Sequence, residues 1–354
     1  RLQAELEQAC RDTGFALVGP NCIGIINTAM PAILSFASFM TEVDTLPTGD
    51  VSMVSQSGGL ATMAQAMMQR AGIGFRFMIS SGNEAVLGLP DYIHALAHEP
   101  GTRIIAVYLE GVRDGARFRA ALDAAKRAGK PVVILQGGRT EASARAAAAH
   151  TGALATPRRV ADAIFRQHGV IAVETLEELV DTLGFLSSAG VDRMPRGPGV
   201  AVVTFGGGIG VLAADHCARH GLRTPALRAA TQAALAPVVP PIAATENPID
   251  LTPQVFNQAQ WFTHFSRALD LIAQDDGIDS VLLAFGPMAQ RGVETAREIC
   301  AFRTRTNRAV AIAWPLAPRG VPEVLREAGV YTFDEPARAI EVLARIARRE
   351  VSAG

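Results

Sequence analysis

Lysine is nearly absent from this chain of 354 residues, and no excess of arginine makes up the charge. Lys126 and Lys130 are the only lysines, and the 33 basic residues face 34 acidic ones, for a formal net charge of −1. A protein that binds nucleic acid needs a basic excess to release counterions from phosphates. The charge balance therefore argues against nucleic acid as a partner.

Cysteine is also scarce, and long hydrophobic runs are missing. The four cysteines are far apart, at Cys10, Cys22, Cys217 and Cys300, so neither a disulfide framework nor a Cys-x-x-Cys zinc motif is expected. No apolar run reaches the roughly 18 residues that a membrane span requires. We expect a cytoplasmic protein with no membrane partner.

The composition is otherwise that of an ordinary globular protein. Hydrophobic residues make up 49% of the chain and charged residues 19%, and the length suffices for two or three domains with cores of their own. The chain starts at Arg1, inside an expected helix, and not at a methionine. We expect it to be a piece of something longer.

Short apolar segments alternate with helical patterns from residue 47 to residue 190. The expected strands are Val51–Val54, Phe75–Ser80, Arg103–Leu109, Pro131–Leu135 and Val170–Val173. Helices are expected at Gly58–Ala71, Pro90–His98, Ala116–Ala128, Pro157–His168 and Leu176–Leu186. This alternation is typical of a parallel sheet that helices cover on both faces.

A second series of the same kind follows a stretch rich in proline and glycine at residues 191–199. It occupies residues 199–354, with expected strands at Val200–Thr204, Ser280–Phe285 and Ala309–Trp314. We predict an α/β protein with two flavodoxin-like parallel-sheet domains. Residues 1–46, with a helix at Leu2–Thr13 and an expected strand at Phe15–Val18, resemble the last βα unit of a preceding domain.

Two polar motifs lie where expected strands end. Ser55-Gln56-Ser57-Gly58-Gly59 opens a helix, where free N–H groups and the helix dipole favour an anion; an ordinary N-cap is the alternative. Glu110 ends another strand, and ligands of α/β proteins bind at such ends. A carboxylate there can hold an imidazole by Nδ1–H and free Nε2 as a nucleophile; a surface carboxylate in a turn is the alternative.

His150 lies in a segment of small residues, Ala146 to Ala149 before it and Thr151-Gly152-Ala153 after it. Small neighbours leave an imidazole uncovered, so that another chain or a large ligand can approach it. A histidine in a core would have bulky neighbours instead. The segment makes His150 a candidate for chemistry, with an ordinary core or surface histidine as the alternative.

The remaining motifs favour structural roles. The glycine-rich turn at Gly206–Gly210 lacks the Lys-Ser/Thr of a P-loop, so tight packing between strand and helix is favoured over a phosphate cradle. His94/His98 and His216/His220 each have the i,i+4 spacing of metal ligands. Neither pair has the glutamate of a His-Glu-x-x-His motif or an evident third ligand, so no metal site is predicted.

Six motifs follow one another along the chain: Val18–Gly24, Ser55–Gly59, Ser81–Ala85, Tyr108–Val112, His150–Ala155 and Asn247–Asp250. Together they resemble those of the NDP-forming acyl-CoA synthetases, relatives of succinyl-CoA synthetase, and particularly of their ADP-forming acetyl-CoA synthetase branch. The resemblance implies that His150 is a transiently phosphorylated carrier, that Glu110 steadies it, and that Ser57, Gly58 and Gly59 hold the phosphoryl group. It also implies Asn21, Cys22 and, more weakly, Asn83 in an acyl or CoA site.

The resemblance further implies the reaction, its cofactors and its partners. An acid, CoA and ATP would give acyl-CoA, ADP and phosphate through an acyl phosphate and a phosphohistidine. Residues 1–46 would be the remnant of a CoA-binding Rossmann domain, residues 47–190 the ligase domain with the phosphohistidine, and residues 199–354 a second ligase domain. ATP or ADP and Mg²⁺ would bind through an ATP-grasp subunit or fused domain outside this chain, within an oligomer.

Two other functions remain open at this point. Protein acetyltransferases of bacteria carry a related, non-catalytic regulatory module that has lost the histidine, and the presence of His150 argues against that interpretation. A flavodoxin-like protein for FMN or another phosphate ligand is the second alternative. Only two tryptophans and three tyrosines could flank a flavin ring. Neither the acid nor the choice between ADP and GDP can be predicted.

Overall fold

The computed structural model describes residues 2–30, 32–37, 46–140, 142–143, 157–288 and 290–351. Its chain divides into two compact units, one ending at Ser187 and the other running from Ser188 to Val351. The division lies inside the last turn of helix α7 (Leu176–Ala189). Among the described residues, no helix is both long and apolar enough to cross a membrane.

Unit 1 is built on a seven-stranded sheet in the order β2-β1-β4-β3-β5-β6-β7. Five of these strands run parallel: β3 (Thr48–Ser55), β4 (Phe75–Ser80), β5 (Ile104–Leu109), β6 (Val132–Gln136) and β7 (Ile171–Val173). Their apolar residues are buried on both faces, as expected for a sheet that helices cover on both sides. The expected α/β class is confirmed.

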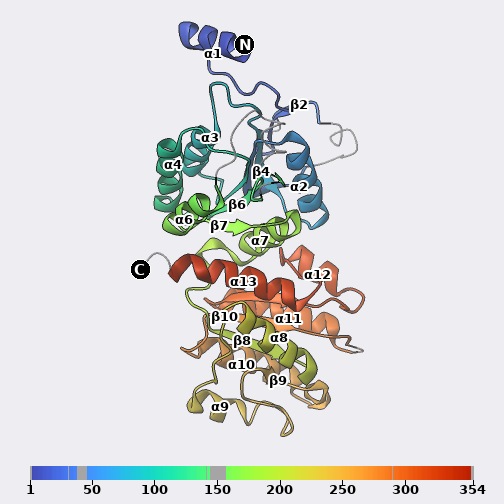
Figure 1. Ribbon diagram of the computed structural model, residues 1–354. Coiled ribbons are helices and arrows are strands. Elements are labelled where there is room, and N and C mark those ends of the chain that lie inside the picture. Colours follow the sequence, from blue (N-terminus) through green and yellow to red (C-terminus); the bar gives the residue numbers. More distant parts are fainter. Residues whose placement is uncertain are drawn as a thin grey trace. The chain divides into compact units, whose positions relative to one another are not determined.

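The helices of unit 1 follow from amphipathic segments between these strands. They are α1 (Leu2–Thr13), α2 (Gly58–Arg70), α3 (Leu89–His98), α4 (Gly115–Arg127), α6 (Arg158–His168) and α7. Figure 1 shows α3 and α4 on one side of the sheet and α2 on the other. Asp114 caps α4 by accepting hydrogen bonds from the N–H groups of Ala116 and Arg117, each at 3.0 Å.

The structure differs from the sequence-based prediction at the first strand of unit 1. Phe15–Val18 is not a strand; the chain instead turns at Gly19–Asn21 and forms β1 (Gly24–Asn27) and β2 (Ala32–Ser35). These strands pair antiparallel, and β1 is also antiparallel to β4. The sheet of unit 1 is therefore mixed, because a short hairpin extends its parallel part.

Unit 2 contains a parallel four-stranded sheet in the order β11-β10-β8-β9. The strands are β8 (Val200–Thr204), β9 (Ile249–Asp250), β10 (Ser280–Ala284) and β11 (Ala309–Ala313). Its helices are α8 (Gly207–Arg219), α9 (Ala229–Leu235), α10 (Trp261–Gln274), α11 (Gly292–Arg305), α12 (Val321–Glu327) and α13 (Pro336–Val351), with a 3₁₀ helix, η3, at Pro253–Asn257.

Alternate residues of the unit 2 strands pack against different helices. Side chains such as Val203, Leu283 and Ile312 join those of α10 and α11 in one core cluster. Helix α13 packs against α8, β10 and β11. The side chain of Asn247 is hydrogen-bonded to the start of β8. Its Nδ2 donates to the Val200 carbonyl at 2.7 Å, and its Oδ1 accepts from the Val202 N–H at 3.0 Å.

Candidate functional site

The carboxyl ends of β4, β3, β5 and β6 meet along one edge of the unit 1 sheet. Ser55 pairs in register with Ser80 and Tyr108, and Leu109 pairs with Gln136. The residues that follow these strands are therefore neighbours although they are far apart in the sequence. Turns after carboxyl strand ends are where α/β proteins place their ligands.

The Ser57-Gly58-Gly59 segment forms the start of α2, directly after β3. Ser57 is the N-cap, and its Oγ accepts a hydrogen bond from the Leu60 N–H at 3.4 Å. The first N–H groups of a helix have no acceptor within the helix and carry its positive dipole end. A Cβ on Gly58 would lie 2.6 Å from Cγ2 of Ile23, whereas a Cβ on Gly59 would meet open space. The geometry suits an approaching anion on the Gly59 side.

Glu110 follows β5, and Gln56 holds its backbone in place. The Gln56 Oε1 accepts hydrogen bonds from the N–H groups of Glu110 at 2.6 Å and Gly111 at 3.1 Å, and Nε2 donates to the Gly111 carbonyl at 2.9 Å. One carboxylate oxygen of Glu110, Oε2, is buried and has no hydrogen-bond partner among the described residues. An unpaired buried carboxylate oxygen is costly unless a donor reaches it.

Tyr108 contacts the same carboxylate. Burial, the charge of Glu110 and a hydrogen bond to Glu110 raise the pKa of Tyr108 to about 12. Close approach of the next turn is possible only because residue 137 is glycine: a Cβ there would lie 2.6 Å from the Tyr108 hydroxyl. Tyr108 therefore stays protonated at neutral pH and serves as a fixed donor.

Glu84 is a second carboxylate at this edge, and it is buried. Its Oε1 accepts hydrogen bonds from Ser81 Oγ at 2.8 Å and from the Leu89 N–H at 3.2 Å. Burial raises the pKa of Glu84, although these hydrogen bonds, one with Gln56 and the charge of Arg113 lower it in part. Its backbone has a φ of 54°, in the left-handed region that non-glycine residues seldom adopt.

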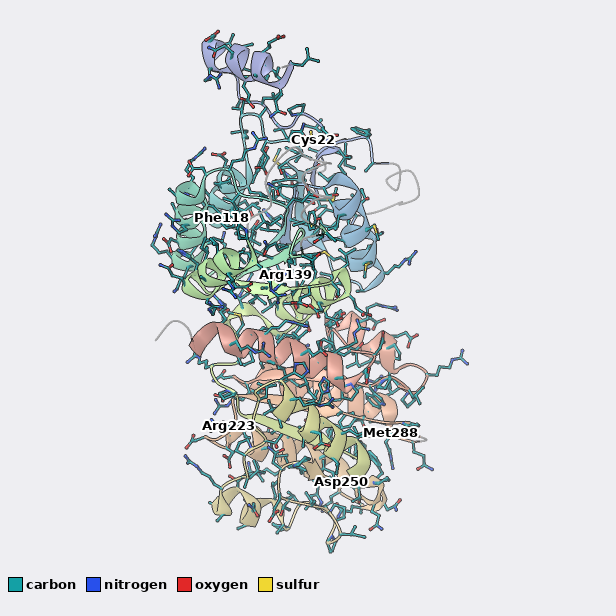
Figure 2. All side chains as sticks on the ribbon, viewed as in Figure 1. Cys22, Phe118, Arg139, Arg223, Asp250 and Met288 are labelled. Atoms are coloured by element: carbon teal, nitrogen blue, oxygen red, sulfur yellow. The ribbon has the colours of Figure 1, made fainter. Side chains whose placement is uncertain are left out.

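Asn21 and Asn83 contact each other, and the side chain of the adjacent Cys22 makes a different contact. The Asn21 amide donates to Asn83 Oδ1 at 3.2 Å, and the Asn83 N–H donates to the Pro20 carbonyl at 2.8 Å. The Cys22 thiol is instead directed at the Val18 carbonyl of its own turn, at 3.8 Å. Figure 2 labels Cys22 in unit 1.

A small pocket joins these groups. Its lining combines Asn83, Glu84, Glu110 and Arg113 with Gln56, Gly82 and Gly111. The structure thus brings Glu110 and Asn83 to one pocket. Ser57 is not among the lining residues, but it directly follows Gln56, which is. Cys22 does not line the pocket, and His150 lies outside the described residues.

Sequence reasoning assigned no role to Gln56, Glu84 or Arg113. The first two stand inside motifs that the sequence displays, Ser-Gln-Ser-Gly-Gly and Ser-Gly-Asn-Glu-Ala. The partners of Gln56 are 54 or more residues away, and those of Glu84 include the first backbone N–H of α3. Only the folded chain shows those contacts.

Unit 2 has a larger cavity at the corresponding strand ends. It has a volume of about 590 Å³, within the range of small-molecule sites. Its apolar walls come from Phe205 after β8, Ile209 in α8, Phe256 in η3 and Met288 after β10. Figure 2 labels Met288 and Asp250 in this unit.

The polar groups around this cavity are amides and not charges. Gln254, Asn257 and Gln290 are its polar side chains, and none of the described lining residues is charged. Phe205 fixes the aromatic wall, with its ring centroid 4.9 Å from that of Phe256 and 4.5 Å from that of Phe285. The arrangement suits a ligand with an apolar body and few charges inside the cavity.

The glycine-rich segment Gly206–Gly210 forms the N-cap and the first turn of α8, and Gly210 packs closely against its neighbours. A Cβ on Gly210 would lie 3.1 Å from the Pro248 Cβ and 3.4 Å from the Thr204 Cγ2. A Cβ on Gly207 would lie 3.3 Å from a carboxylate oxygen of Asp250. Gly206 caps α8 without a side-chain hydrogen bond, and the nearby carboxylate of Asp250 would repel a phosphate at this helix start.

Comparisons with known proteins place this chain among acid–CoA ligases. The family described as succinyl-CoA ligase like flavodoxin domain matches residues 48–186. Over 98% of its length, the chain is 32% identical to the ADP-forming acetate–CoA ligase I of Archaeoglobus fulgidus, and it spans about half of that relative, 48%. It is 31% identical to the alpha subunit of ADP-forming acetate–CoA ligase I of Pyrococcus furiosus, with 98% of this chain and 73% of the subunit covered.

A solved structure agrees with these relatives. The dinucleotide-forming acetyl-coenzyme A synthetase 1 of Ca. Korarchaeum cryptofilum, solved with phosphate and ADP, superposes with a TM-score of 0.85 at 26% identity. The superposition covers 99% of this chain and 74% of the other. Both units therefore have counterparts within one solved chain.

Proposed function

The chain belongs to the family of ADP-forming acetate–CoA ligases, and from this premise we propose that it carries the phosphoryl-transfer part of an ADP-forming acyl-CoA ligase. The overall reaction would convert an acid, CoA and ATP into acyl-CoA, ADP and phosphate. The observation that carries the proposal is Glu110. Its buried Oε2 has no hydrogen-bond partner among the described residues, and this residue follows β5 at the same sheet edge as the start of α2.

His150 is the proposed carrier in this reaction. Its imidazole nitrogen would form a bond to the phosphorus of ATP while the bond to the ADP oxygen breaks. The phosphoryl group would then pass from nitrogen to a carboxylate oxygen of the acid. The CoA sulfur would finally attack the acyl carbon and displace phosphate. Each step exchanges one bond for another, so no oxidant or reductant is required.

Glu110 is proposed to position the carrier. A carboxylate that accepts the Nδ1–H of His150 fixes the tautomer and leaves the lone pair of Nε2 free to attack phosphorus. Tyr108 and the Gln56 clamp support this role, because they hold the carboxylate and its backbone from two sides. Ser57, Gly58 and Gly59 would bind the phosphoryl oxygens through the start of α2.

The residues proposed for acyl or CoA binding include two asparagines of unit 1. We propose Asn21 and Asn83, which contact each other at 3.2 Å, for the acyl or CoA site, and Cys22 in its vicinity. Residues 1–46 are proposed to be the end of a CoA-binding domain, residues 47–190 the carrier domain and residues 199–354 the second ligase domain. Strands β1 and β2 lie within residues 1–46 and belong to the sheet of unit 1, so this segment is joined directly to the proposed carrier domain.

Further parts of the enzyme are proposed to lie outside this chain. The chain spans about half of the A. fulgidus relative, and a relative of P. furiosus is named as an alpha subunit. An ATP-grasp subunit or fused domain would bind ATP or ADP with Mg²⁺, within an oligomer. CoA would supply the thiol, and this chain's residues would carry the phosphoryl group.

Phosphate transfer from ATP tests the proposal directly. The full-length protein and its ATP-grasp partner would be incubated with γ-labelled ATP and Mg²⁺, and the label on this chain tested for lability in acid and stability in base. We expect label on the wild type and on a His94→Ala control, and none on His150→Ala. An unlabelled wild type beside an active partner would contradict the proposal and favour a regulatory module.

A further inference from the structure

Two histidines and a glutamate from two helices of unit 2 converge at the end of α8 opposite to the cavity of that unit. His216 lies in the last turn of α8, and His220 follows it as the C-cap, with ring centroids 4.6 Å apart. Glu341 comes from α13, which packs against α8. One donor atom from each of the three lies within 4.8 Å of the other two.

The pairwise contacts leave donor atoms available. His216 Nε2 lies 3.5 Å from Glu341 Oε1, and it is buried with no hydrogen-bond partner in the described part of the chain. The other oxygen of Glu341, Oε2, accepts a hydrogen bond from Arg345 at 3.2 Å. An ordinary histidine–carboxylate pair would satisfy Nε2, and this arrangement does not.

We propose that His216, His220 and Glu341 bind a Zn²⁺ ion, with water as the fourth ligand. Two imidazoles and a carboxylate with an open fourth position form a donor set that zinc adopts in proteins. Tetrahedral zinc with bonds of about 2.0–2.1 Å places its ligand atoms roughly 3.3–3.4 Å apart. The 3.5 Å separation of His216 and Glu341 is close to this spacing.

Two arginines near the site act on a bound ion in opposite ways. Arg345 fixes Glu341 as the outer partners of metal-binding carboxylates commonly do. Arg345 and Arg348 also oppose a cation, because their charges act on His220. The ion must offset that repulsion through three direct bonds.

The ion would join α8 to α13, so its expected effect is stabilisation of unit 2. It has no part in the proposed phosphoryl transfer. A ligand that binds only the folded state stabilises it by RT ln(1 + c/Kd) at a free ligand concentration c, so the melting temperature rises with the logarithm of the ligand concentration. At a hundredfold excess over Kd we expect the unit 2 transition to rise by roughly 5 °C or more.

The sequence supplies a matched control. His94 and His98 have the same i,i+4 spacing and the same 4.6 Å ring separation in α3. No carboxylate joins them in a metal-ligating group among the described residues. A His94→Gln/His98→Gln variant should therefore behave like the wild type toward zinc.

The test uses the whole chain without a histidine tag, stripped with chelator and titrated with Zn²⁺ or Co²⁺. We expect one ion per chain in the wild type and in the α3 control, with tetrahedral Co²⁺ absorption bands. Glu341→Gln and His220→Gln should bind at least tenfold more weakly. Their melting temperatures in chelator show whether they fold. Wild-type binding that is absent, or that folded Glu341→Gln retains in full, would overturn the proposal.

Discussion

The two units have the same kind of edge and fill it with opposite chemistry. In each, parallel strands end beside a glycine-containing turn and the start of a helix, α2 in unit 1 and α8 in unit 2. Unit 1 places Gln56, Glu84 and Glu110 at that edge. Unit 2 places aromatic and aliphatic side chains there. The comparison shows that the fold provides the position, while a few residues after each strand decide what the edge can bind.

Removing the charge of Glu110 is the strongest way to break this comparison. Glu110→Gln keeps the shape of the side chain but cannot stabilise a charged imidazole or enforce its tautomer. We expect phosphohistidine formation to slow on the order of 10²–10⁴-fold, with the melting temperature nearly unchanged. Rapid-quench measurement of label from ATP tests this. A wild-type rate in the variant would remove Glu110 from the proposed mechanism.

Two glutamines in unit 1 differ in the hydrogen bonding of their side-chain amides. Gln56 makes three hydrogen bonds to the backbone of Glu110 and Gly111, whereas both amide atoms of buried Gln65 have no partner among the described residues. We expect Gln56→Ala to destabilise unit 1 by about 1–2 kcal/mol. Gln65→Leu should stabilise it by a similar amount, about 1 kcal/mol.

Urea unfolding measured for both glutamine variants tests this pair. The midpoint should shift in opposite directions while the m value stays constant. Gln56→Ala should also slow labelling, because the Glu110 backbone loses its clamp. A destabilised Gln65→Leu protein would mean that the amide of Gln65 has partners outside the described residues.

Most of the scaffold could be predicted from the sequence, because its strands are continuous apolar runs. Phe75–Ser80 and Val200–Thr204 were expected with the bounds that the structure shows. The β1–β2 hairpin was missed, since four-residue strands containing Gly24 and Asn27 display no useful periodicity. Phe15–Val18 was wrong because an apolar run of four residues does not identify a strand without knowledge of its partner.

The sites could be predicted only in part, for a related reason. Glu110 and Ser57 stand at strand ends that the pattern of the sequence reveals, so their neighbourhood could be expected. The cavity of unit 2 draws Phe205, Phe256 and Met288 from three distant turns, and in a sequence such residues are indistinguishable from core residues. The role of His150 stays a prediction, because it lies outside the described residues.

Buried carboxylates extend the comparison to the pH dependence of stability. Burial raises the folded-state pKa of Glu84 above its ordinary value of 4.5. A raised pKa contributes stability that is full below the unfolded value and is lost as pH rises through the folded value. In unit 2, burial also raises the pKa of Asp275. Hydrogen bonds from the Arg228 N–H, Thr231 and the Gly277 N–H lower this pKa by more than burial raises it, so it lies below 3.8.

The two carboxylates should therefore give pH effects of opposite sign, which are the smallest of the predicted effects. Glu84→Gln should gain stability relative to the wild type as pH rises above about 4.5, because the wild type alone must bury a charge. Asp275→Asn should lose stability at neutral pH and approach the wild type as pH falls below 3.8. Urea unfolding of each variant between about pH 2 and pH 8 measures both differences. A stability difference between Glu84→Gln and the wild type that does not change with pH would mean that Arg113 and the hydrogen bonds fully offset the cost of burying the Glu84 charge. The polar edge of unit 1 would then be no more sensitive to pH than the apolar edge of unit 2.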